Sequence, residues 1–168
     1  MISNLQFDFL VDKEKKTITV KKEFAANVSL VWDAFTKKEI LDQWWAPKPW
    51  KSRTKSHDFR EGGERLYAMV GPAGEEHWAV FKFQKIDKPN YFSGVDGFTD
   101  ADGVLNPEMP LLNWKVNFTG KGATTLVEVN ISFDTLDQLA KILEMGFKDG
   151  FTIALQSLDE LLLSLKKK

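Results

Sequence analysis

Between residues 136 and 165, apolar side chains recur at steps of three and four positions. The repeat consists of Leu136, Leu139, Leu143, Phe147, Phe151, Ala154, Leu158, Leu162 and Leu165. This period predicts one long amphipathic helix with a single apolar stripe. At about 1.5 Å per residue the helix would span about 45 Å, so its stripe needs an equally long apolar partner. Because the preceding sequence holds many strand patterns and no second long helix, that partner is predicted to be a β-sheet.

Two features mark the start and the middle of the predicted helix. Asp134 and Thr135 are residue types that favour the N-cap, and Gln138 lies three positions after Thr135, as in a capping box. Gly146 and Gly150 lie within the periodic run, and each costs about 0.8 to 1 kcal/mol relative to alanine inside a helix. Two explanations are open. The glycines allow close packing or a bend against the sheet, or the missing side chains leave room for a ligand beneath the helix.

The composition is that of one ordinary globular domain covering residues 1–168. Hydrophobic residues make up 43% of the chain and the formal net charge is −1, so nothing in the charge balance favours nucleic acid or an anionic membrane surface. The absence of cysteine excludes disulfides, thiolate metal sites and cysteine nucleophiles. No signal peptide or membrane span is predicted, which makes the cytoplasm the expected location. Six tryptophans and thirteen phenylalanines are enough to fill a core or line a pocket.

Alternating apolar residues and turn signals before the helix predict a meandering antiparallel sheet. The predicted strands span residues 7–11, 17–24, 51–59, 64–70, 77–86, 91–95, 111–118 and 125–133. Residues 96–110 are predicted to form a long polar connection. Two short helices are predicted after the strand at 17–24: one over residues 28–35 with Asn27 as its N-cap, and one over residues 37–45 opened by a Thr36 and Glu39 capping box. This order of elements defines an α+β fold.

Several short motifs follow one another in an order that resembles a known family. They are Val31-Trp32-Asp33-Ala34-Phe35-Thr36, Trp44-Trp45-Ala46-Pro47, Asp58-Phe59-Arg60-Glu61-Gly62-Gly63, Asp100-Ala101-Asp102-Gly103 before Pro110, and Gly146-Phe147. From about residue 17 to residue 165 the chain resembles the activator-of-heat-shock-protein-ATPase-like proteins of the START-like (SRPBCC) helix-grip superfamily. The resemblance implies a curved antiparallel sheet of about six to seven strands around the C-terminal helix, with a cavity between them. It leaves the strand at residues 7–11 either as an addition or as the start of a longer first strand.

The candidate ligand-binding residues are aromatic side chains and one glycine that would border this cavity. They are Trp44, Trp45, Trp50, Phe81, Trp114, Phe147, Gly150 and Phe151. Two roles are open for the cluster of Trp44, Trp45 and Trp50. Its members plug one end of the sheet as core residues, or they form a cavity mouth that grips a flat or apolar ligand.

No catalytic motif can be identified, but His57, Arg60 and Tyr67 are candidates for catalytic roles. His57 shares strand parity with Phe59 and would face inward with it. Tyr67 could donate a hydrogen bond from a cavity wall, and Arg60 could hold an acidic ligand if it points inward. The alternatives are a polar surface or core histidine, a packed tyrosine, and an arginine paired with carboxylates on the outer face of a hairpin. The segment Asp100-Ala101-Asp102-Gly103 fails the EF-hand spacing at both ends, so no metal site or cofactor is predicted.

Three functions remain open. The first is the binding of a small apolar or aromatic molecule in a cavity of about 300 to 1,000 Å³ under the C-terminal helix. The second is a module that interacts with a heat-shock chaperone, which the family resemblance implies. The third is an enzyme of the cyclase or hydrolase type seen on related folds, which rests on fold analogy alone. No nucleic-acid partner is expected, and the chain is expected to be a monomer or a homodimer.

Overall fold

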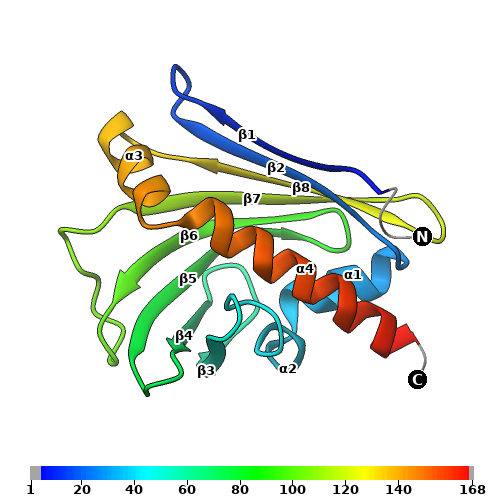
Figure 1. Ribbon diagram of the computed structural model, residues 1–168, viewed down its shortest axis with the longest axis horizontal. Helices are drawn as coiled ribbons and strands as arrows, with labels where there is room; N and C mark the ends of the chain where they lie inside the picture. Colours follow the sequence, from blue (N-terminus) through cyan, green and yellow to red (C-terminus); the bar gives the residue numbers. More distant parts are fainter. Residues whose placement is uncertain (1–4, 167–168) are drawn as a thin grey trace.

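The computed structural model describes residues 5–166, and its central element is one eight-stranded antiparallel sheet. The strands lie in the order β1-β2-β8-β7-β6-β5-β4-β3. The sheet is open and curved, and the C-terminal helix lies across its concave face (Figure 1). This is the predicted α+β helix-grip arrangement. Its eight strands correspond to the eight segments that alternation predicted, one or two more than the six to seven expected for the helix-grip sheet.

The N-terminal hairpin joins a meander whose last strand returns to pair with the second strand. The strands are β1 (Phe7–Asp12), β2 (Thr17–Phe24), β3 (Lys51–His57), β4 (Glu64–Val70), β5 (Glu76–Asp87), β6 (Tyr91–Thr99), β7 (Leu111–Gly120) and β8 (Thr125–Ser132). Because β2 pairs with both β1 and β8, β1 is an additional edge strand and not a longer start of β2.

Capping side chains set the start of two of the helices. The helices are α1 (Val28–Thr36), α2 (Lys38–Leu41), α3 (Leu136–Glu144) and α4 (Phe147–Lys166). The side chain of Asn27 accepts a hydrogen bond from the Leu30 N–H at the start of α1, as predicted. Thr135 caps α3 in the same way by accepting from the Gln138 N–H. No helix within residues 5–166 is both long and apolar enough to cross a membrane.

The prediction of one continuous helix over residues 136–165 is wrong, because Gly146 divides that run into α3 and α4. Gly146 has a φ of +89°, a left-handed conformation that side chains disfavour and that commonly ends helices. Its N–H donates to the Leu143 carbonyl, which closes the last turn of α3. The apolar period continues through the break, so the spacing of apolar residues does not reveal it. α3 consequently departs from the direction of α4 at one end of the sheet (Figure 1).

The second short helix is shorter than predicted, and the expected capping box does not form. Thr36 belongs to the last turn of α1, where its hydroxyl donates to the Trp32 carbonyl. Lys37 is the N-cap of α2 and provides no side-chain hydrogen bond to it. Because the Thr36 hydroxyl serves the preceding helix, α2 lacks that support, and it ends at Leu41 instead of residue 45.

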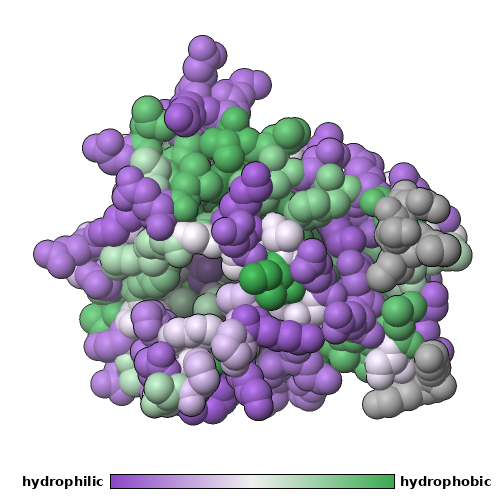
Figure 2. Space-filling model, in the orientation of Figure 1, coloured by the Kyte–Doolittle hydropathy of each residue, from purple (hydrophilic) through white to green (hydrophobic). Residues whose placement is uncertain are grey.

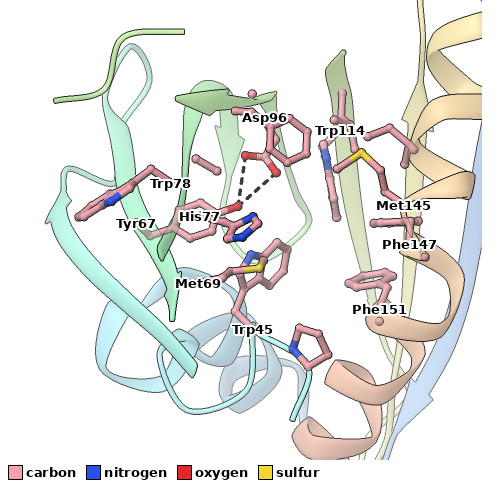
Figure 3. A pocket seen from close by; sticks show the side chains of 18 residues that line it. Trp45, Tyr67, Met69, His77, Trp78, Asp96, Trp114, Met145, Phe147 and Phe151 are labelled. Carbon is pink, nitrogen blue, oxygen red and sulfur yellow. Dashed lines mark hydrogen bonds between the residues drawn. The ribbon is translucent and has the colours of Figure 1, made fainter. Parts of the chain in front are cut away.

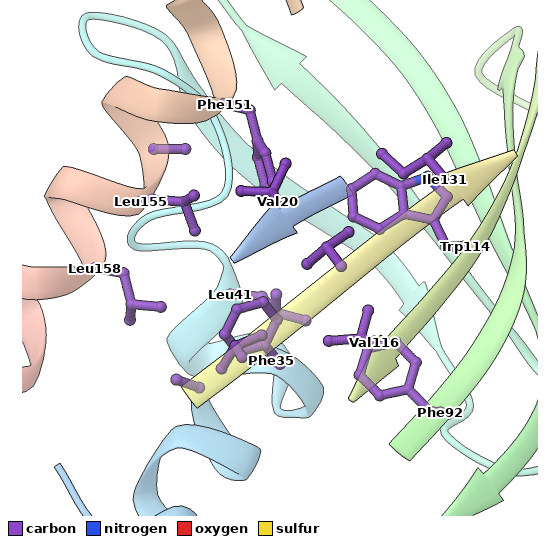
Figure 4. Close-up of a cluster of buried hydrophobic side chains, with 14 of the residues drawn as sticks. Val20, Phe35, Leu41, Phe92, Trp114, Val116, Ile131, Phe151, Leu155 and Leu158 are labelled. Atoms are coloured by element: carbon purple, nitrogen blue, oxygen red, sulfur yellow. The ribbon is translucent and has the colours of Figure 1, made fainter. Parts of the chain in front are cut away.

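The core lies between the concave face of the sheet and the helices α1 and α4. Leu155 and Leu158 of α4 point toward β2, β7 and β8 (Figure 4), and both are buried. Burying each such side chain contributes about 1.5 to 3 kcal/mol. Below them, Phe35 of α1 meets Phe118 of β7 edge to face, with ring centroids 5.5 Å apart. Buried apolar side chains thus fill the space under the second half of α4, whereas a pocket lies under its first half.

Candidate functional site

A pocket of about 230 Å³ lies beneath the first turns of α4, between that helix and strands β4 to β7. Figure 2 shows its mouth as a recess beside α4, and Figure 3 shows its interior. Its walls are mostly apolar, and its large aromatic side chains include Trp45, Tyr67, Trp114, Phe147 and Phe151. This volume is below the range of about 300 to 1,000 Å³ expected for a ligand cavity.

The local sequence explains why several aromatic rings meet here. Phe147 and Phe151 are four residues apart at the start of α4, so they project from one face of the helix, and their rings stack with centroids 5.3 Å apart. Trp114 of β7 meets the Phe151 ring edge to face at 5.7 Å. Trp45 follows α2 and lies 5.6 Å from the Trp114 ring. Continuous aromatic contacts therefore connect α4, β7 and the turn after α2.

The two glycines at the start of α4 both line the pocket, for different structural reasons. Gly146 makes the turn between α3 and α4, so the bend explanation holds at that position. Gly150 lies inside α4, and a Cβ atom added there would lie 3.6 Å from Cγ of Pro47, an ordinary van der Waals contact. A larger side chain at Gly150 would therefore occupy space between α4 and the Pro47 turn.

One carboxylate interrupts the apolar wall of the pocket. Asp96 of β6 accepts a hydrogen bond from the Tyr67 hydroxyl, which lies 3.3 and 3.2 Å from its two oxygens (Figure 3). Burial raises the pKa of Asp96 to about 7, although the Tyr67 hydroxyl and the charge of Arg65 both act in the opposite direction. Burial, followed by the charge of Asp96, also raises the pKa of Tyr67 above its ordinary value. Near neutral pH the Tyr67 phenol is therefore an uncharged donor, and the Asp96 carboxyl group is present in both its protonated and its ionised form.

Behind Tyr67 lies a buried guanidinium, that of Arg65, which is 3% exposed. It stacks over the Tyr67 ring at 4.1 Å from the ring centroid. It also donates to Asp42 at 3.2 Å and to Ser52 at 2.8 Å. Within residues 5–166, Arg65 forms its ion pair with Asp42, and no lysine, arginine or histidine forms one with Asp96. The charge of Arg65 thus acts on Asp96 without a direct ion pair between the two side chains.

The pocket brings together part of the predicted ligand-binding set. Trp45, Trp114, Phe147, Gly150 and Phe151 line it. Trp44 is instead a core residue, 1% exposed, whose indole N–H donates to the Ala34 carbonyl at 2.9 Å. Phe81 borders a much smaller space of about 30 Å³ deeper in the core. Trp50 lies outside the pocket lining, with its ring against that of His77 at 5.2 Å.

The three catalytic candidates do not come together in this pocket. Tyr67 lines it, whereas His57 and Arg60 do not. His57 places Nε2 2.7 Å from the Thr36 carbonyl and stacks on Phe59, and burial lowers its pKa. Arg60 pairs with Asp58 at 2.7 Å on the surface, which is the outer-face alternative. Among residues 5–166, no three His, Asp or Glu side chains gather as metal ligands would.

Asp96 is the functional candidate that the sequence prediction missed. The predicted strand ended at residue 95, which is wrong, because β6 continues to Thr99. In β6 the position of Asp96 is fixed by pairing with Phe81 of β5 and Leu112 of β7. Alternation from the buried Phe92 would have placed residue 96 on the inner face. An aspartate in an otherwise apolar face was the available signal, and a strand ended one residue early concealed it.

The sequence matches one family model over residues 25–163, described as Activator of Hsp90 ATPase homolog 1-like protein. Among solved structures, protein Ms6760 from Mycobacterium smegmatis is 30% identical, with 94% of this chain and 96% of that protein covered and a TM-score of 0.86. A protein from Arthrobacter aurescens is 27% identical over 94% and 91% of the two chains, with a TM-score of 0.89. One from Staphylococcus epidermidis is 26% identical over 92% and 93%, with a TM-score of 0.80. A search of curated proteins gave no match.

Proposed function

This chain belongs to the family of Activator of Hsp90 ATPase homolog 1-like proteins, and within that family we propose that it binds one small, mostly apolar molecule in the pocket beneath α4. The observation that carries the proposal is the pocket itself, a space of about 230 Å³ with aromatic walls and one carboxylate. Pockets of this kind, mostly apolar with few convergent polar groups, are the usual form of small-molecule sites.

The chemistry of the walls favours a flat molecule. Trp45, Trp114 and Phe151 border the space from three different elements, and an aromatic contact with a ligand ring is worth about 0.5 to 1.5 kcal/mol beyond the area that it buries. Met69 and Met145 add two flexible side chains that adapt to an irregular outline. The volume of about 230 Å³ restricts the ligand to a small molecule of no more than about three rings.

The proposal is tested with N-phenyl-1-naphthylamine, an uncharged probe whose fluorescence rises in apolar surroundings. Gly150→Leu places a side chain in the space between α4 and the Pro47 turn. Ser164→Leu adds the same side chain at an exposed position of the same helix and is the matched control. We expect saturable probe binding to the wild type and to Ser164→Leu, and at least tenfold weaker binding to Gly150→Leu, with urea unfolding confirming that each variant is folded.

Equal probe binding by both variants would place the probe elsewhere and would count against the pocket. Native mass spectrometry of the protein as purified provides a second readout, because a bound small molecule appears as one discrete mass increment. A displaceable increment identifies the natural ligand by its mass.

The second candidate function is an interaction with a heat-shock ATPase, and the family description is the observation that favours it. The measurement is stimulation of the chaperone's ATP hydrolysis by this protein, at concentrations well above micromolar. Unchanged hydrolysis together with no complex in a pull-down would dispose of this candidate and would leave the ligand-binding proposal untouched.

A further inference from the structure

We propose that the pocket beneath α4 selects a cationic ligand, a small arylalkylamine whose ammonium group pairs with Asp96 while its ring lies among the tryptophan and phenylalanine side chains. This inference rests on the proposed function, because it names the class of molecule that the same pocket binds.

The pocket presents a carboxylate group to a ligand. Asp96 lines the pocket and keeps part of its surface accessible. The Tyr67 hydroxyl donates to it, and the Gly97 backbone N–H also acts on it as a donor. These two donors leave lone pairs on the carboxylate free for further donors. A carboxylate with so few donors in an apolar wall is under-solvated, and an ammonium group would satisfy it.

The buried positive charge near Asp96 is already paired with another carboxylate. Arg65 is the buried cation near it, and Arg65 is paired with Asp42 at 3.2 Å on the far side of the Tyr67 ring. Of the other cations near this end of the fold, Arg53 and Lys55 lie over the ring of the pocket residue Trp78, 5.6 and 5.7 Å from its centroid, and Lys148 lies over the Phe9 ring at 5.7 Å. Among residues 5–166 none of these cations forms an ion pair with Asp96, so its negative charge lacks a direct partner.

Aromatic rings border the pocket together with this carboxylate. Trp45, Tyr67 and Trp114 all border the pocket together with Asp96 (Figure 3). Tryptophan and tyrosine faces attract cations, and such contacts are the basis of aromatic cages for ammonium groups. A neutral ring and a cationic amine therefore both find a match in the same lining, and the amine gains the carboxylate in addition.

The indole N–H groups do not make the pocket suited to an anion. Nε1 of Trp45 and Nε1 of Trp114 are both covered by other atoms, and the Trp45 N–H lies near enough to the Tyr67 hydroxyl to act on it as a donor. Because they are inaccessible to a water-sized atom, they offer no donor to a carboxylate or sulfonate ligand. An anion entering the pocket would face Asp96 instead, in surroundings of low dielectric constant where like charges repel strongly.

The charge of Asp96 also gives the proposal a pH signature. The titratable and charged groups that face it are Tyr67 and Arg65 from β4, with His77 of β5 in the same lining. An ammonium ligand binds the ionised carboxylate, so below the pKa of Asp96 its affinity should fall by up to tenfold for each pH unit.

Calorimetry with three ligands of matched shape tests the inference: 2-naphthylmethylamine, 2-naphthylmethanol and 2-naphthoate. At pH 8 we expect the amine to bind at least tenfold more tightly than the alcohol, and the naphthoate more weakly than both. Asp96→Asn should abolish this preference, while the affinity for 2-naphthylmethanol stays within about threefold of the wild-type value. Asp102→Asn, which removes an exposed carboxylate of the loop after β6, should keep the full preference.

The outcomes separate this inference from the function on which it rests. Equal affinity for the amine and the alcohol overturns the cation preference and leaves the apolar binding site standing. A preference that survives in Asp96→Asn also overturns it, because the cation would then bind elsewhere. If none of the three compounds binds and N-phenyl-1-naphthylamine also fails, the proposed function itself fails.

Discussion

Replacing Asp96 with asparagine should stabilise the protein most at pH 8 and about a third as much at pH 5. In the folded protein burial raises the pKa of Asp96 to about 7, whereas an aspartate in an unfolded chain has a pKa of about 3.9. The folded state therefore binds this proton more tightly than the unfolded state does. The contribution of Asp96 to the free energy of unfolding is complete below pH 4 and is lost as the pH rises to about 7. An asparagine side chain does not ionise in this range, so the unfolding free energy of the variant does not fall as the wild-type value does when Asp96 loses its proton.

The magnitude follows from the gap between the two pKa values. Each pH unit of that gap corresponds to about 1.4 kcal/mol, so a gap of about three gives an upper value of about 4 kcal/mol. Asp96 keeps part of its surface accessible in the pocket, where water screens the charge. We therefore expect a stabilisation of about 2 kcal/mol at pH 8. The Tyr67 hydroxyl can donate to an amide oxygen as well as to a carboxylate, so its hydrogen bond persists in the variant.

Urea unfolding at pH 5, 6, 7 and 8, followed by tryptophan fluorescence and circular dichroism, measures this effect. The quantity of interest is the difference in unfolding free energy between the variant and the wild type, because the titration of all other groups cancels in it. Asp102→Asn should give a difference that stays within about 0.5 kcal/mol at every pH, the usual size of a surface substitution. The reasoning is refuted if the Asp96→Asn difference is equally flat, or if the variant is the less stable protein at pH 8.

Three further substitutions test other parts of the fold by the same unfolding measurement. Gly146→Ala should destabilise the protein by about 1 to 2 kcal/mol, because φ at this position is +89°; an unchanged midpoint would mean that the turn between α3 and α4 tolerates a side chain. Gly150→Ala should stabilise it by up to about 0.8 kcal/mol through helix propensity, since the new Cβ makes only an ordinary contact with Pro47; a loss of stability would contradict this. Asp159→Asn should lower the free energy of unfolding by about 2 to 4 kcal/mol, because it leaves the charge of Lys22 buried without its partner at 2.9 Å. As a control, the double variant with Lys22→Met should recover this stability.

The sheet could be predicted closely because its signals are local. Alternation and turn residues located all the strands, and Asn27 and Thr135 marked helix starts that the structure confirms. The break between α3 and α4 could not be read in the same way. The apolar period and the helix propensity show only that Gly146 is unfavourable within a helix. Whether the helix continues or ends at a glycine depends on the tertiary contacts of the following turn. Here α4 must lie across the sheet, and the turn at Gly146 allows α3 to leave that direction.

The site was less predictable than the fold because a pocket depends on distances between elements. Aromatic residues of similar sequence context reached different places: Trp45 lines the pocket, while its neighbour Trp44 is buried in the core with its N–H bonded to Ala34. The turn after α2 decides between them, and its conformation is not a matter of periodicity. Asp96 was missed for a simpler reason, since one residue in the length of β6 separates a loop aspartate from one on the inner face of the sheet.

The placement of charges explains how an apolar wall comes to contain a carboxylate that destabilises it. The buried cation nearby, Arg65, is paired with Asp42, and Ser52 and Thr54 occupy further donors of its guanidinium. Had Arg65 reached Asp96 directly, the two charges would cancel and the pKa of Asp96 would lie low. Instead Tyr67 stands between them, bonded to the carboxylate and stacked on the guanidinium. Unfavourable groups of this kind persist where function requires them. The same uncompensated charge that lowers stability above pH 7 is therefore the feature by which the pocket can distinguish a cation from a neutral molecule of equal shape.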